Sequence, residues 1–284
     1  MGVLLVLSLG ALIYWEMRSS NPVINFRVLK ERNLAVSCLI IFCAYGVLYG
    51  VTTSLPGLLQ ALFGYDAYLS GLVQSPAGLG SVLMLVVVGT LLGRGIDARW
   101  LIAGGLLVMA AGCYWMARMN LYISPFQVVW PRVVTIAGLS MIFAPLNVAA
   151  FKYIPPHLRG AAVGLFALLR NEGGSVGTSM AQTIEERRLQ FHSSRVDEFL
   201  DPLNPHVKTF LEQARAFFFQ QTGDAAGSLH RTVQALENLR LQQAESLAYF
   251  DVFWVAAVLG VALAFLVLWM KRSVAEKGAH VGAE

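Results

Sequence analysis

Ionisable side chains lie deep inside two long apolar stretches of this chain. Arg132 falls several residues into one stretch, and Arg170, Asn171 and Glu172 lie near the middle of another. Charges at such depth are costly in a bilayer, so they usually face the interior of a helical bundle or a water-filled path. Burial raises the pKa of a carboxyl group towards neutrality. Glu172 is therefore the residue best suited to bind and release a proton inside a membrane.

The spacing of these charges limits how they interact. Arg170 and Glu172 are two positions apart, so on a helix they point in different directions and do not neutralise each other. We expect at least one of them to face a cavity or a neighbouring helix. Arg170 either holds helices together, by capping carbonyls or pairing with a carboxylate, or biases the titration of Glu172 in transport. Arg132 is expected to line the outer half of a path, and Asp251 to be an interfacial residue.

Small residues and prolines mark where helices could approach or bend. Glycine pairs four positions apart allow close contact between helix backbones, and proline inside a span frees carbonyl groups. We predict packing or conformational roles for Gly173, Gly174, Gly177 and Pro145. The glycine pairs are Gly46 and Gly50, Gly89 and Gly93, Gly160 and Gly164, and Gly173 and Gly177.

The composition indicates which elements position these residues. Hydrophobic residues make up 56% of the 284 residues, charged residues make up 13%, and the mean hydropathy is +0.60. Such a chain belongs in a membrane. The net charge is +4, but Lys and Arg fall in short segments between apolar runs, which favours lipid headgroups over nucleic acid as partners. Cys38, Cys43 and Cys113 lie in apolar runs, as buried thiols rather than disulfides or metal ligands.

The apolar runs predict an all-α, polytopic membrane bundle of about seven spans with one long extramembrane loop. Residues 1–184 form the bundle, 185–246 an outer loop, 247–270 the last span and 271–284 a cytoplasmic tail. The first run is only about 21 Å long as a helix, and is interpreted as the tail of a longer span, with a cleaved signal peptide as the alternative. The predicted spans are 2–15, 33–60, 70–93, 100–118, 125–151, 160–183 and 247–270.

Charge in the short connections predicts the orientation of the bundle. Lys and Arg are concentrated in alternate connections, which we place in the cytoplasm by the positive-inside rule. The outer loop carries residues at helical spacing from Val207 to Phe218. A second stripe, from Leu229 to Phe250, extends into the last span, and together they predict two amphipathic helices. These helices either pack on the outer mouth of the bundle or form a docking surface for another protein. The cytoplasmic basic residues are Arg18, Arg27, Lys30, Arg32, Arg94, Arg99, Lys152, Arg159, Lys271 and Arg272.

Signatures of soluble enzymes are missing from the sequence. It contains no GxxxxGK phosphate loop, no HExxH, no CxxC and no nucleophile elbow, and its five histidines are scattered over loops and the tail. We therefore expect neither an enzyme nor a cofactor or metal site. A membrane-embedded enzyme would need a catalytic constellation that these residues do not supply.

Several segments resemble the major facilitator superfamily, and within it the fourteen-span drug:proton antiporters of the EmrB and QacA type. The most specific are Leu146-Asn147, the proline-rich turn at 154–160 and the glycine-rich stretch at 169–177. The connection at 21–26 resembles the link after the family's eighth span. Residues 93–99, with Gly93, Arg94, Asp97 and Arg99, resemble the superfamily's cytoplasmic gating motif.

The resemblance covers Leu4 to Lys271 and corresponds to the C-terminal half of such an antiporter. It implies a multi-pass protein of the plasma membrane, in bacteria the inner membrane, that exports amphipathic drug-like molecules in exchange for protons. It also implies two protein partners, a periplasmic adaptor of a tripartite efflux system and a missing N-terminal half that forms the other wall of the path. The alternative is a truncated, non-transporting fragment or a membrane scaffold of a split transporter.

Overall fold

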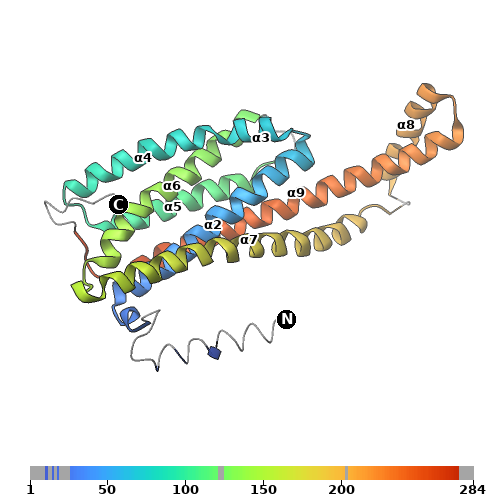
Figure 1. The fold of residues 1–284 in the computed structure, drawn as a ribbon. Coiled ribbons are helices and arrows are strands. Elements are labelled where there is room, and N and C mark those ends of the chain that lie inside the picture. Colours follow the sequence, from blue (N-terminus) through green and yellow to red (C-terminus); the bar gives the residue numbers. More distant parts are fainter. Residues whose placement is uncertain are drawn as a thin grey trace.

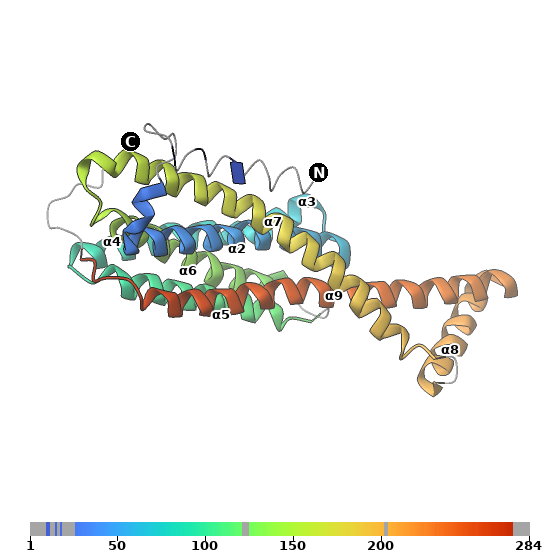
Figure 2. The same cartoon turned by 90° about the horizontal axis from the view of Figure 1, so that it is seen from below.

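A computed structural model describes residues 26–120, 125–201 and 204–274, together with the single positions 10, 11, 15 and 18. In this part of the chain all regular structure is helical, and the long helices run side by side as a bundle (Figures 1 and 2). The predicted all-α membrane bundle is confirmed. The elements are η1 (Phe26–Lys30), α2 (Arg32–Phe63), α3 (Ala67–Gln74), α4 (Pro76–Gly93), α5 (Ala98–Ala117), α6 (Pro125–Phe151), η2 (Pro156–Leu158), α7 (Arg159–Asp197), α8 (Pro205–Thr222) and α9 (Ala225–Val267).

Among the described residues, five helical segments are long and apolar enough to cross a membrane: α2, α3 with α4, α5, α6 and α9. The predicted first span at 2–15 lies almost entirely outside the described residues, as do residues 21–25 of the predicted link at 21–26. Helix α7 is less apolar because it carries Arg170, Glu172 and a charged outer part, yet it lies along α2 within the bundle (Figures 1 and 2).

Several helix boundaries differ from the apolar runs. The run at 70–93 is divided near Ser75, where α3 ends and Pro76 begins α4; proline lacks the N–H group that a continuing helix needs, but fits the first helical turn. Helices α7 and α9 continue far beyond the apolar residues. With 43 residues, α9 is about 65 Å long, roughly twice the thickness of a bilayer core. The outer parts of α7 and α9 therefore project from the bundle, with α8 at their far end (Figure 2).

Glycine brings α2 and α7 into backbone contact. A Cβ atom placed on Gly173 would collide with the carbonyl oxygen of Phe42, and one on Gly177 would collide with the backbone of Gly46. Helices α5 and α6 meet in the same way, because a Cβ on Gly105 would lie 2.7 Å from the carbonyl oxygen of Gly138. We call the first contact the α2/α7 glycine seam, formed by Gly46, Gly50, Gly173 and Gly177. By contrast, Gly89, Gly93, Gly160 and Gly164 have no neighbouring atom within 4 Å of an added Cβ.

The seam generates a prediction with a matched control on one helix. Gly177→Ala should destabilise the chain by about 1 to 3 kcal/mol, because the added methyl group forces α2 and α7 apart. Gly164→Ala should be neutral or stabilising, since alanine favours a helix over glycine by about 1 kcal/mol and the site is open. Thermal unfolding of the purified variants in detergent measures both. Equal melting temperatures would contradict the seam.

Candidate functional site

The charged stretch of α7 lies on an exposed face of the bundle. Arg170, Asn171 and Glu172 are all exposed. The guanidinium of Arg170 lies 5.6 Å from the centre of the Tyr45 ring in α2, within the range of a cation–π interaction. The Tyr45 ring in turn contacts Phe143 of α6, with centroids 5.2 Å apart. An aromatic row across two helices therefore holds Arg170 against the bundle.

A shallow polar hollow continues from this charged stretch along α7. It is lined by Tyr49 of α2 and, from α7, by Asn171, Gly174, Ser175, Thr178 and Ser179. The hydroxyl groups of Ser175 and Thr178 donate to carbonyl groups of their own helix. A polar strip at this depth is unfavourable against lipid tails, so it requires water or another protein surface.

Glu172 has no polar partner within the described part of the chain, where it forms neither an ion pair nor a hydrogen bond. We expected Arg170 or Glu172 to face a cavity or a neighbouring helix, and Arg170 is the residue that contacts α2. The carboxyl group of Glu172 is therefore not used to hold these helices together.

Arg132 is a buried cation in α6, only 6% exposed. One guanidinium nitrogen, Nη2, donates to the Thr52 hydroxyl of α2 at 2.7 Å, while the buried Nη1 has no hydrogen-bond partner. No carboxylate of the described residues pairs with it. Leaving a buried donor unsatisfied costs about 1 to 3 kcal/mol, so Arg132 is a poor choice for stability alone.

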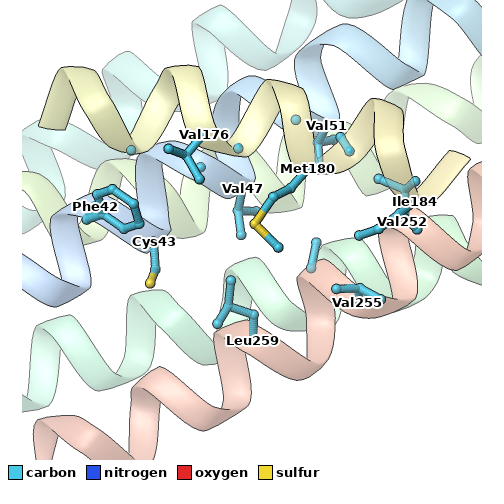
Figure 3. Close-up of a pocket in the computed structure, with 16 residues that line it drawn as sticks. Phe42, Cys43, Val47, Val51, Val176, Met180, Ile184, Val252, Val255 and Leu259 are labelled. Carbon is cyan, nitrogen blue, oxygen red and sulfur yellow. The ribbon is translucent and has the colours of Figure 1, made fainter. Parts of the chain in front are cut away.

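An apolar cavity of about 260 Å³ lies between α2, α7 and α9 (Figure 3). Its labelled side chains, such as Val47, Met180 and Val255, point into it from the three helices, and the α2/α7 glycine seam forms one wall. We did not predict this cavity from the sequence, because the contribution of α9 depends on how the helices assemble. The glycine spacing in α2 and α7 was the only available signal.

The gating-like motif caps α5 and binds the segment after α9. Asp97 forms a 2.9 Å ion pair with Arg99 and accepts a hydrogen bond from the backbone N–H of Ser273 at 3.1 Å. Arg99 also donates to the carbonyl oxygen of Met270 at 3.0 Å. Gly93 and Arg94, by contrast, are exposed. Asp97 and Arg99 therefore bind the segment after α9 to the start of α5, and we call these contacts the Asp97 clamp.

Asn33, which no sequence motif indicated, also binds this segment. Its side chain accepts from the N–H of Lys271 at 2.7 Å and donates to the hydroxyl of Ser273 at 3.0 Å. Beyond α6, the hydroxyl of Tyr153 donates to the carbonyl oxygen of Arg272 at 2.6 Å. The segment after α9 is thus bound to α2, to α5 and to the turn after α6. The residues Arg99, Lys152 and Lys271, predicted to be cytoplasmic, therefore lie at one end of the bundle, which we call the inner end.

The sequence pattern of the Major Facilitator Superfamily matches residues 1–178. This chain belongs to that superfamily. It is 30% identical to the multidrug export protein EmrB of Haemophilus influenzae, over 96% of this chain and 52% of the relative. It is 28% identical to EmrB of Escherichia coli K12, over 99% of this chain and 53% of the relative. It is 27% identical to the fatty acid resistance protein FarB of Neisseria gonorrhoeae, over 96% of this chain and 52% of the relative.

The predicted resemblance to EmrB-type drug transporters is thereby confirmed. The predicted location, as a multi-pass protein of the inner membrane, is also confirmed. The chain spans about half the length of the curated relatives it matches. The superfamily consists of transporters rather than enzymes.

The Asp97 clamp predicts a pH-dependent effect at the inner end. Burial alone would raise the pKa of Asp97, but hydrogen bonds from Arg99 and Ser273 and the charge of Arg99 hold this pKa below its usual range. The clamp is therefore complete above the ordinary pKa of an aspartate and weakens as the pH falls through the lowered value.

Asp97→Ala should release residues 270–274, at a cost of about 1.5 to 3 kcal/mol for hydrogen bonds to a charged group. Hydrogen exchange of the Ser273 amide at neutral pH should become at least about tenfold faster, which corresponds to 1.4 kcal/mol. Asp66→Ala, which removes the cap of α3 instead, should leave this amide unchanged. Unchanged exchange in Asp97→Ala would contradict the clamp.

Proposed function

We propose that this chain is the C-terminal part of a proton-coupled multidrug exporter that moves amphipathic small molecules out of the cell. The observation that carries the proposal is the charged and polar strip of α7, which lies on an exposed face of an otherwise apolar bundle. Its chemistry suits one wall of a water-filled path. The similarity to export proteins such as EmrB supports the same function.

The other wall of the path would come from an N-terminal half. In this mechanism two halves rock against each other around a site near the middle of the membrane. Relatives about twice as long as the matched region support this partner, and the same observation favours the second candidate, a non-transporting fragment or scaffold.

In the proposed exporter, Glu172 carries the proton. It is free of ion pairs within the described residues, so its carboxyl group can load and release a proton without disrupting a helix contact. Arg170, on the same exposed face, is held against α2 by Tyr45 and keeps a positive charge on this strip. Arg132 is assigned to the outer half of the path, where the Thr52 hydroxyl of α2 accepts a hydrogen bond from its guanidinium.

The outer projection would serve a periplasmic adaptor protein, as in a tripartite efflux system. Arg240 of α9 ties α7 to α9 by pairing with Asp197, so the projection is braced. On it, Phe199, Phe217 and Phe219 are exposed, and exposed aromatic residues are typical of docking surfaces.

Glu172→Gln tests the proton site, because glutamine keeps the volume but does not titrate. With a co-expressed N-terminal half of a related transporter, this variant should abolish pH-dependent export while expression stays normal. Glu198→Gln, an exposed residue on the outer projection, should export like the wild type. Ethidium efflux from cells at two external pH values measures the effect.

Two outcomes of this experiment would count against the proposal. Wild-type pH dependence in Glu172→Gln would remove Glu172 from the mechanism. Export by this chain without any N-terminal half would overturn its assignment as one part of a transporter. Absence of export with every N-terminal half tested would favour the scaffold.

Replacing Phe217 and Phe219 with serine tests the adaptor surface. Both side chains are about half exposed, so their loss should leave folding intact and lower adaptor capture by at least about tenfold, the effect of losing 1.4 kcal/mol. Leu83→Ser and Val86→Ser, on the membrane part of α4, should leave capture unchanged. Co-purification from crosslinked cells measures capture, and an unchanged yield in the double phenylalanine variant would restrict this face to a packing role.

A further inference from the structure

The apolar cavity has the shape of a narrow slot. Along α2 its lining extends from Phe42 to Val51, and along α7 from Gly173 to Ile184. A length of nine to eleven helical steps corresponds to about 15 Å. A volume of about 260 Å³ spread over that length leaves room for one extended hydrocarbon chain rather than a bulky ring system.

The outer end of this slot is identified by the direction of its helices. Helices α2 and α7 both run outward and α9 runs inward, so Val51, Ile184 and Val252 lie together at one end (Figure 3). Glu185 follows directly after Ile184, and Tyr249 precedes Val252 by almost one turn. The Tyr249 hydroxyl interacts with the Glu185 carboxyl group and lies close to Gly57 of α2.

Negative charge predominates at this outer end. Glu245 of α9 and Glu186 of α7 act on Glu185 in addition to Tyr249, and α2 has no charged residue after Arg32. Farther along α7, Arg187 is exposed, and Arg188 and His192 are bound to Asp251 of α9 at 3.3 Å and 2.8 Å. The slot therefore combines apolar walls with an acidic mouth.

We propose that this slot binds a single-chain amphiphile with a cationic headgroup, with the alkyl chain between α2, α7 and α9 and the headgroup at Glu185. The inference rests on the proposed export function, which it deepens by giving such molecules a binding site. Proton and headgroup compete for one carboxylate, so the amphiphile binds only when Glu185 has lost its proton.

The surroundings of Glu185 shift this competition to a pH above the usual pKa of a glutamate. Glu185 lies beyond the predicted span at 160–183, about 39 Å along α7 from Arg159. Burial, reinforced by Glu245 and Glu186 and opposed by the Tyr249 hydroxyl, raises the pKa of Glu185. Binding should consequently weaken as the pH falls through this raised value.

Photolabelling of the purified chain in phosphatidylcholine nanodiscs tests the site. The probe is decyltrimethylammonium with a diazirine near the end of its chain, and adducts are located by mass spectrometry. We expect adducts on Val47, Met180 and Val255, with labelling at about pH 8 exceeding that at about pH 5 by roughly fivefold or more. Glu185→Gln should lose both the excess and its pH dependence, whereas Glu198→Gln, an exposed residue farther along the outer projection, should behave like the wild type.

Probes with the same chain distinguish the cationic amphiphile from lipid. A decanoate or a decylphosphocholine diazirine should label the slot several-fold less than the ammonium probe. Equal labelling by the phosphocholine probe would assign the slot to a lipid chain and overturn the proposal, as would unchanged labelling in Glu185→Gln or adducts confined to lipid-facing residues such as Leu83 and Phe265. This assay needs neither transport nor a second half, so its failure would leave the role of Glu172 untouched. Intact labelling without export would count against the export function alone.

Discussion

The backbone contact between α2 and α7 is the constraint on which the rest of the bundle depends. Gly46, Gly173 and Gly177 let the two helices meet without side chains between them. Within a bilayer, helices gain little by burying apolar surface, so close packing of this kind supplies much of their attraction. The seam also fixes the rotation of α7. It turns the polar residues after Arg170 to one side and Val176, Met180 and Ile184 to the other, into the slot shared with α9.

The two ends of the bundle are built in different ways. At the inner end, side chains of Asn33, Asp97 and Arg99 bind backbone groups of the segment that follows α9. These hydrogen bonds connect parts of the chain that are far apart in sequence. At the outer end, α7 and α9 extend beyond the bilayer and are joined by ion pairs, including those of Asp251. The outer projection is therefore continuous with the slot through α7 and α9, while the inner end holds the last span in place.

Much of the fold could be predicted, because long apolar runs and short basic connections are local features of the sequence. The seam residues Gly173 and Gly177 and the clamp residues Asp97 and Arg99 were also indicated by local motifs. Asn33, Tyr45 and the slot were not, since their roles depend on partners more than one hundred residues away or on a third helix. The outer part of α7 reads as a loop by hydropathy alone. Its Glu, Arg, Gln and Leu residues favour a helix, which explains why α7 continues to Asp197.

The residues that this bundle leaves unsatisfied are the ones that support the proposed transport function. Stability alone would favour an apolar residue at position 132, because a buried guanidinium with one unpartnered nitrogen is unfavourable. It would also favour an apolar face for α7, where Asn171 and Glu172 instead interrupt a membrane helix. The slot shows the same conflict, since its apolar walls end at Glu185, with Glu245 and Glu186 acting on the same carboxyl group. Residues whose type conflicts with good packing are concentrated at functional sites. Here they occur along α7 and the faces of α2, α6 and α9 beside it, so these surfaces are where protons, substrates and a second half of the transporter would meet.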